Sequence, residues 1–316
     1  MNRIATVLLL LVLLRNGMPA ALHGQTVEPR EVITLQSGWR FALGPHTGAE
    51  APAYDDTGWE SVQVPHDWAI GGPFLPDGDG NTGKLPWKGE GWYRRALEVP
   101  DAWAGRRVYL VFDGVMAFPR VWVNGAPAGS WDYGYNSFYL DVTDHLHPGG
   151  GNVLAVHADT REHDSRWYPG AGIYRKVRMV AVDPVHVDVW GTHVMTPIVQ
   201  PHYAEVRVRT TVVNASGADQ EVALEQTVLS PEGREVARGD VRGTVRGEGS
   251  GELEVNLALT NPRRWDVEDP VLYTVRTTVR AGGEVRDVYH TPFGVRTIRF
   301  DADHGFWLND RRVQLR

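Results

Sequence analysis

The chain has 316 residues and a net charge of -7 at pH 7; 42% of its residues are hydrophobic and 22% are charged. This length predicts two domains and a fragment of a third. The acidic balance argues against nucleic acid or an anionic membrane as a main partner, and the absence of cysteine excludes disulfides, thiolate nucleophiles and Cys-ligated zinc.

The start of the chain has the pattern of a secretory signal. Arg3 supplies a positive charge, and the apolar run from Ile4 to Leu14 is too short to span a bilayer. We therefore expect residues 1–25 to be a signal peptide and the protein to be secreted or periplasmic. An uncleaved N-terminal anchor is the alternative. The rest of the sequence predicts no membrane span.

Residues 26–184 alternate between short strands and turns. Val108, Leu110 and Phe112 share one face of a predicted strand, as the two-residue period of a sheet requires. Asn124-Gly125 is a strong hairpin signal, because both residues tolerate the positive φ of a type I′ turn. We find no convincing amphipathic helix, so this region predicts an antiparallel β-sandwich.

Two stretches interrupt that pattern. Residues 70–90 form a long Gly-, Pro- and Asp-rich loop, which we interpret as a lid beside a sugar site. Residues 165–175 read Ser-Arg-Trp-Tyr-Pro-Gly-Ala-Gly-Ile-Tyr-Arg. Pro169 restricts φ, while Gly170 and Gly172 permit positive φ, so a tight corner is predicted before the next strand. Such a corner can also be purely structural, with its aromatic residues in the core.

A second domain is predicted over residues 185–291. Apolar and polar residues alternate from Val206 to Val212 and again from Leu253 to Leu259. This pattern fits an immunoglobulin-like sandwich without the cysteine pair of antibody domains. It contains no candidate site, and we interpret it as a spacer.

Five motifs occur in an order that resembles glycoside hydrolase family 2, the family of β-galactosidases and β-glucuronidases. They are Val64-Pro65-His66-Asp67-Trp68, Gly91-Trp92-Tyr93-Arg94-Arg95, Val121-Trp122-Val123-Asn124-Gly125, the corner from Arg166 to Arg175, and Phe293-Gly294-Val295-Arg296. The resemblance covers about residues 31–316, and the form of the corner is closer to the β-galactosidase branch.

This resemblance implies an all-β fold in two parts. A jelly-roll (galactose-binding-like) sandwich over 26–184 would precede an immunoglobulin-like β-sandwich over 185–291. Residues 292–316 would begin a (β/α)8 barrel. Because a barrel needs about 250 residues, we expect the catalytic domain to be truncated in this chain.

The implied activity is hydrolysis of terminal β-galactosides with retention. Retaining glycosidases use two carboxylic acids about 5 to 5.5 Å apart. In this family both are barrel glutamates, and the acid/base one follows an asparagine. The sequence contains no Asn-Glu pair, so we expect no catalytic residue here and no activity from this chain alone.

The family also implies substrate-binding residues in the first domain. Its β-galactosidases offer galactose an aspartate, which also contacts a sodium ion, and sometimes an asparagine. Counting back from Gly172, the aspartate falls on Asp164; the asparagine would fall near Asn81, across a variable loop. Arg166 would donate two hydrogen bonds to sugar hydroxyls or form an ion pair with Asp164. Asp67 is a further candidate substrate-binding residue. The structural alternatives are an Asx turn at Asp164 and a turn at Asp67 that accepts backbone N–H bonds.

The resemblance implies no cofactor in this chain; Na+ or Mg2+ is compatible with the complete enzyme. The expected partner is a β-galactoside, although glucuronides and mannosides stay open as substrates. The complete enzyme could also form a homo-oligomer. Two other functions remain: a stand-alone carbohydrate-binding β-sandwich protein, and an adhesion or scaffolding protein without a ligand. The barrel-like sequence at the end favours the glycosidase.

Overall fold

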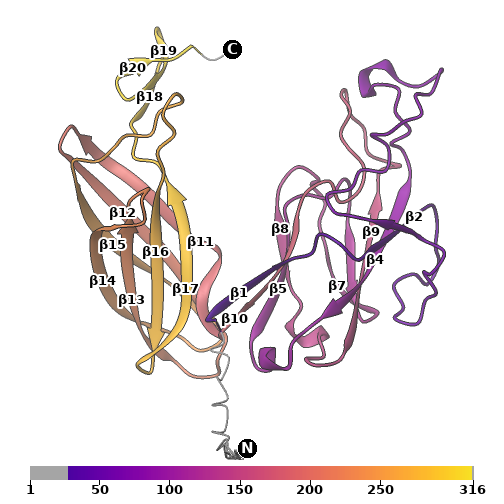
Figure 1. Cartoon of the computed structure of the whole chain (residues 1–316), viewed down its shortest axis with the longest axis horizontal. Helices are drawn as coiled ribbons and strands as arrows, with labels where there is room; N and C mark the ends of the chain where they lie inside the picture. The colour runs from indigo at the N-terminus through magenta and orange to yellow at the C-terminus, as the bar shows by residue number, and fades with distance from the viewer. Residues whose placement is uncertain (1–27, 315–316) are drawn as a thin grey trace, which may run out of the picture.

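The computed structural model describes residues 28–314, and this part of the chain is built from antiparallel sheets with no α-helix. The predicted all-β class is confirmed. The predicted signal peptide, residues 1–25, lies outside the described residues. Figure 1 shows two sandwich units side by side, with a small third sheet beyond the second unit. None of the helices among the described residues is long and apolar enough to cross a membrane.

The first unit packs a six-stranded sheet, in the order β3-β2-β4-β9-β6-β7, against a four-stranded sheet, β1-β10-β5-β8. Its strands are β1 (Arg30–Thr34), β2 (Trp39–Leu43), β3 (Glu60–Val62), β4 (Glu90–Glu98), β5 (Arg107–Phe112), β6 (Arg120–Val123), β7 (Ala126–Ser130), β8 (Phe138–Asp141), β9 (Gly151–Asp159) and β10 (Val177–Val182). Alternate residues face inward, and the core between the sheets includes Trp39, Tyr93 and Phe112. Short 3-10 helices lie at η1 (Gly80–Thr82), η2 (Asp101–Trp103) and η3 (Thr143–His145).

The second unit packs β11-β12-β15 against β14-β13-β16-β17. Its strands are β11 (Val185–Gln200), β12 (Tyr203–Asn214), β13 (Gln220–Leu229), β14 (Glu235–Val245), β15 (Gly249–Thr260), β16 (Tyr273–Ala281) and β17 (Glu284–Phe293). Phe293 and Val295 are buried in its core, so that core extends beyond residue 291. A three-stranded sheet follows, with β18 (Ile298–Asp301), β19 (Gly305–Leu308) and β20 (Arg311–Arg312).

Two local predictions are confirmed. Asn124 and Gly125 have φ values of 53° and 80° and join β6 to β7 in an antiparallel hairpin. Residues 70–89 form an irregular loop with η1 as their one short helix. In Figure 1 this loop projects at the same end of the molecule as the β18–β20 sheet.

The corner at residues 165–175 is held by a close approach to the core. Gly172 has a φ of 103°, and a Cβ added to it would lie 2.1 Å from the hydroxyl oxygen of Tyr93. Tyr93 is fully buried, and its hydroxyl is hydrogen-bonded to Nδ1 of His66 at 2.8 Å. The backbone of Gly172 exchanges two hydrogen bonds with Met116. Only a glycine fits both the dihedral angle and the space at this position.

The two units are joined by a buried ion pair. Arg30, on β1, donates to both carboxylate oxygens of Asp287, on β17, at 3.0 and 2.6 Å. The same carboxylate accepts the backbone N–H of Val187, and Arg30 donates to the carbonyl of Val187. The two side chains are only 9% and 0% exposed. Nearby, the Tyr109 hydroxyl contacts Nε2 of buried His186 at 3.0 Å.

Replacing Arg30 with methionine is expected to lower the free energy of unfolding by about 3–5 kcal/mol, because it leaves the Asp287 carboxylate buried without its counterion. Urea denaturation measures this loss. Arg209→Met is the matched control, since Arg209 is 41% exposed in its ion pairs and should cost less than about 1 kcal/mol. Equal losses in the two variants would show that the buried pair has no special role.

Replacing Gly172 with alanine is expected to destabilise the protein by about 4 kcal/mol or more, because the new methyl group overlaps Tyr93. Gly105→Ala is the control: Gly105 has a φ of 78° with no atom within 4 Å of the added Cβ, so it reports the backbone cost alone, about 1–2 kcal/mol. Adding Tyr93→Phe to Gly172→Ala should restore part of the loss in thermal unfolding. If the double variant is no more stable than Gly172→Ala, the strain does not come from the contact with the Tyr93 hydroxyl.

Candidate functional site

Asp164 lies on the surface just before the corner, next to Lys88 at the end of the 70–89 loop. Its side chain is fully exposed, and its Oδ1 atom is 3.3 Å from Nζ of Lys88. The Lys88 ammonium also donates to the backbone carbonyls of Arg161, at 3.2 Å, and His163. Lys88 thereby fastens the 161–164 segment to the loop and leaves most of the Asp164 carboxylate free to accept further hydrogen bonds.

A hollow of about 290 Å³ lies beside this pair. Its lining includes Asp164, Lys88 and the loop residues Asp79, Thr82 and Trp87. Trp87 is buried, and the Lys88 ammonium lies 4.8 Å from the centre of its ring. The loop predicted as a lid therefore does border the predicted aspartate. Burial and the nearby Lys88 charge lower the pKa of His163, so its ring stays neutral near pH 7.

Asp67 has a structural role in this structure. Its Oδ1 atom accepts the backbone N–H of Ala69 at 3.0 Å and of Ile70 at 3.3 Å. The Tyr168 hydroxyl donates to the same oxygen at 2.6 Å, which links the turn to the corner. Burial and this carboxylate raise the pKa of Tyr168. These contacts match the turn alternative for Asp67.

Arg166 and Asn81 are exposed and do not line the hollow. Among the described residues, no ion pair joins Arg166 to Asp164. Asn81 lies on η1, and its backbone N–H donates to Oδ1 of Asp79 at 2.9 Å. The structure therefore brings Asp164 to the loop that contains Asn81, but does not gather the four predicted residues around one point. Trp167, which is 58% exposed, donates from its indole N–H to Tyr135 at 2.8 Å.

The Lys88 ammonium contacts Oδ1 of Asp164 and the backbone carbonyls of Arg161 and His163. A hard cation such as Mg2+ is held by several oxygen ligands, so a cation bound at Asp164 would share this carboxylate with the lysine. The predicted sodium site at Asp164 stays a prediction.

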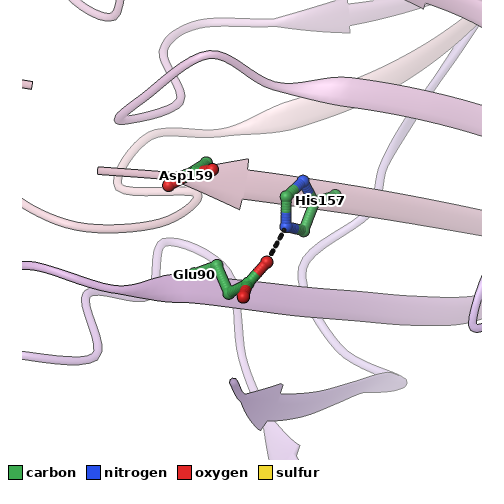
Figure 2. A group of neighbouring side chains, drawn as sticks. All are labelled: Glu90, His157 and Asp159. Atoms are coloured by element: carbon green, nitrogen blue, oxygen red, sulfur yellow. Dashed lines mark hydrogen bonds and ion pairs between the residues drawn. The ribbon is translucent and has the colours of Figure 1, made fainter. Parts of the chain in front are cut away.

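A second polar cluster lies on the outer face of the six-stranded sheet. Figure 2 shows His157, on β9, facing Glu90, on β4, with a distance of 3.0 Å from Nε2 to Oε2. Asp159 lies beside them, and the ligand atoms of all three lie within 4.8 Å of one another. Arg161 donates to Glu90 at 2.9 Å and to Asp159 at 3.0 and 2.6 Å. A metal ion would have to displace this guanidinium.

Sequence reasoning missed Lys88, Tyr168 and the Glu90–His157–Asp159 cluster. No sequence pattern near Lys88 or Tyr168 indicates their roles, because their partners lie far away in the chain. The cluster could have been found in part from the sequence, because His157 and Asp159 are two residues apart in a strand and so share a face.

Two family models match the chain. Residues 33–183 match "Glycosyl hydrolases family 2, sugar binding domain", and residues 185–296 match "Glycosyl hydrolases family 2". Among solved structures, a glycosyl hydrolase family 2 member from Bacteroides cellulosilyticus superposes with a TM-score of 0.85 at 31% identity, covering 90% of this chain and 38% of that one. A β-glucuronidase from glycoside hydrolase family 2 gives 0.84 at 25% identity, covering 92% and 33%.

Curated relatives carry two activities in their names. β-Galactosidase BoGH2A of Bacteroides ovatus is 40% identical over 294 residues, 92% of this chain and 34% of the relative. A β-glucuronidase of Bacteroides fragilis is 29% identical over 311 residues, 93% of this chain and 41% of the relative. The chain thus spans only 34% and 41% of the length of these two relatives. It belongs to glycoside hydrolase family 2, of which it represents the N-terminal domains.

Proposed function

We propose that this chain is the N-terminal part of a secreted or periplasmic family 2 glycosidase that hydrolyses terminal β-galactosides with retention. In this proposal the first unit is the jelly-roll, galactose-binding-like domain and the second is immunoglobulin-like. Residues 292–316 begin the catalytic barrel. The β-galactosidase assignment is supported by the higher identity to a relative of that name than to the β-glucuronidases.

The observation that carries the proposal is the placement of Asp164. Its carboxylate is exposed and borders a hollow beside the 70–89 loop, and that loop projects at the same end of the molecule as the β18–β20 sheet (Figure 1). A carboxylate forms stronger hydrogen bonds to hydroxyl groups than a neutral acceptor does. Asp164 would bind galactose hydroxyls from the hollow, and the exposed Arg166 and Asn81 would contact the sugar from outside it, while Asp67 and Lys88 hold the surrounding backbone in place.

The two catalytic carboxylic acids of a retaining glycosidase are assigned in this proposal to the barrel. This chain supplies binding and orientation: Asp164 accepts from the sugar, and the 70–89 loop limits the approach of water. A homo-oligomer of the complete enzyme is compatible with this proposal. A stand-alone carbohydrate-binding protein is the alternative function.

The 316-residue chain alone is expected to show no turnover of aryl β-galactosides or aryl β-glucuronides. A chromogenic assay on protein purified away from host glycosidases measures this. Turnover that follows the chain through purification would overturn the assignment of both catalytic groups to the barrel.

In an enzyme that joins this chain to its barrel, Asp164→Ala is expected to lower kcat/KM for an aryl β-galactoside about ten-fold or more, equivalent to about 1.4 kcal/mol of lost transition-state stabilisation. The Tm should hardly change, because the side chain is fully exposed. Asp144→Ala, at an exposed position on η3, is the control and should retain full activity. A lower Tm with unchanged kcat/KM would identify Asp164 as a structural residue. If the joined enzyme hydrolyses an aryl β-glucuronide with a higher kcat/KM than the aryl β-galactoside, the proposed substrate is wrong.

A further inference from the structure

The outer face of the six-stranded sheet carries a cleft that the proposed function does not use. Three strands build its floor: Trp92 on β4 is paired directly with His157 on β9, and His157 is paired with Arg120 on β6. Trp122, two residues after Arg120, therefore points to the same face. Strand alternation places all four side chains on the side of the sheet opposite the core.

This cleft has a volume of about 810 Å³. The loop around His46 and Glu50 borders it on one side, and Phe118, Asp132 and Glu162 contribute from others. A volume of this size lies within the range of sites that bind small organic ligands. This cleft is separate from the hollow beside Asp164: Glu162 lines the cleft, whereas Asp164 lines the smaller hollow.

Two indole rings form an aromatic floor. Trp92 and Trp122 are stacked, with ring centres 5.4 Å apart and planes inclined by 26°. On β9, which separates their two strands, Trp122 is paired with the small residue Ala155 and Trp92 with His157. The ring centres of His157 and Trp92 are 4.7 Å apart. Trp92 is buried, whereas Trp122 is partly exposed, so Trp122 is the ring that a ligand can reach.

The polar side of the cleft is held in place before any ligand arrives. Arg161 bonds to both Glu90 and Asp159, and His157 contacts the second oxygen of Glu90. Carboxylates fixed in this way lose little conformational freedom on binding. An aromatic face beside fixed acceptors and guanidinium donors matches the two surfaces of a pyranose, which has apolar C–H faces and a rim of hydroxyls.

We propose that this cleft binds a neutral oligosaccharide, with one sugar ring on Trp122 and its hydroxyls against Glu90, Asp159 and Arg161. The lining contains the carboxylates of Glu50, Glu90, Asp132, Asp159 and Glu162 but the guanidinium groups of Arg120 and Arg161 only. This excess of negative charge disfavours uronates and sulfated glycans. The proposal is independent of the function assigned to Asp164.

The test is titration of the 316-residue chain with cellotetraose, β-1,4-galactotetraose and tetragalacturonate, followed by indole fluorescence and calorimetry. At least one neutral tetrasaccharide is expected to bind saturably with a Kd of about 1 mM or tighter, and tetragalacturonate at least about ten-fold more weakly. Trp122→Ala should weaken neutral binding about ten-fold, and Trp122→Phe less, because it keeps an aromatic face.

Two controls separate this cleft from other surfaces. Trp190→Ala removes an indole that is 48% exposed, and Asp144→Ala removes an exposed carboxylate; neither residue lines the cleft. Both should retain tetrasaccharide binding. If Trp122→Ala does not fold, as judged by circular dichroism, Asp159→Asn tests the polar side and should also weaken binding.

Three outcomes would overturn the proposal: no saturable binding of either neutral tetrasaccharide, unchanged binding in a folded Trp122→Ala or Asp159→Asn variant, or preferential binding of tetragalacturonate. In the joined enzyme, kcat/KM for a small aryl β-galactoside should respond to Asp164→Ala and not to Trp122→Ala. The failure of one proposal is therefore distinguishable from the failure of the other.

Discussion

The close approach of Gly172 to Tyr93 is the constraint on which the candidate site depends. A buried tyrosine hydroxyl occupies the space where any other residue would place its Cβ, and His66 holds that hydroxyl through a hydrogen bond. Backbone hydrogen bonds then join the corner to the 66–68 segment and to Met116. The chain leading into this corner therefore has a defined direction, and Asp164, a few residues earlier, is presented from a rigid base.

Lys88 gives the site its electrostatic character. One ammonium group donates to two backbone carbonyls and approaches the Asp164 carboxylate. The contact is solvent-exposed, and its worth to stability is small. Its effect is on placement: it holds the 161–164 segment against the 70–89 loop, beside the hollow that Asp164 and the loop both border.

The 159–165 segment contributes side chains to two separate hollows. Arg161 and Glu162 border the large cleft on the outer sheet face, whereas Asp164 and Ser165 border the smaller hollow beside the loop. Both surfaces offer carboxylates, but the larger one has a stacked pair of indole rings, Trp92 and Trp122, where the smaller one has the single ring of Trp87. In the proposed enzyme, one segment would thus contribute to recognition of the reacting sugar and to binding of a longer glycan.

The sequence by itself determined the all-β class, the hairpin at Asn124-Gly125 and the irregular loop at residues 70–89, because strand alternation and positive φ are properties of neighbouring residues. Asp164 was reached through the resemblance of the corner to a known family, and its role in sugar binding stays a prediction. Only the tertiary structure decided that Lys88 meets Asp164, 76 positions away, that Tyr168 meets Asp67, and that Arg30 meets Asp287 across 257 positions. Such pairs depend on how loops and sheets pack. The residues next to each partner in the sequence therefore do not indicate which distant residue it will contact.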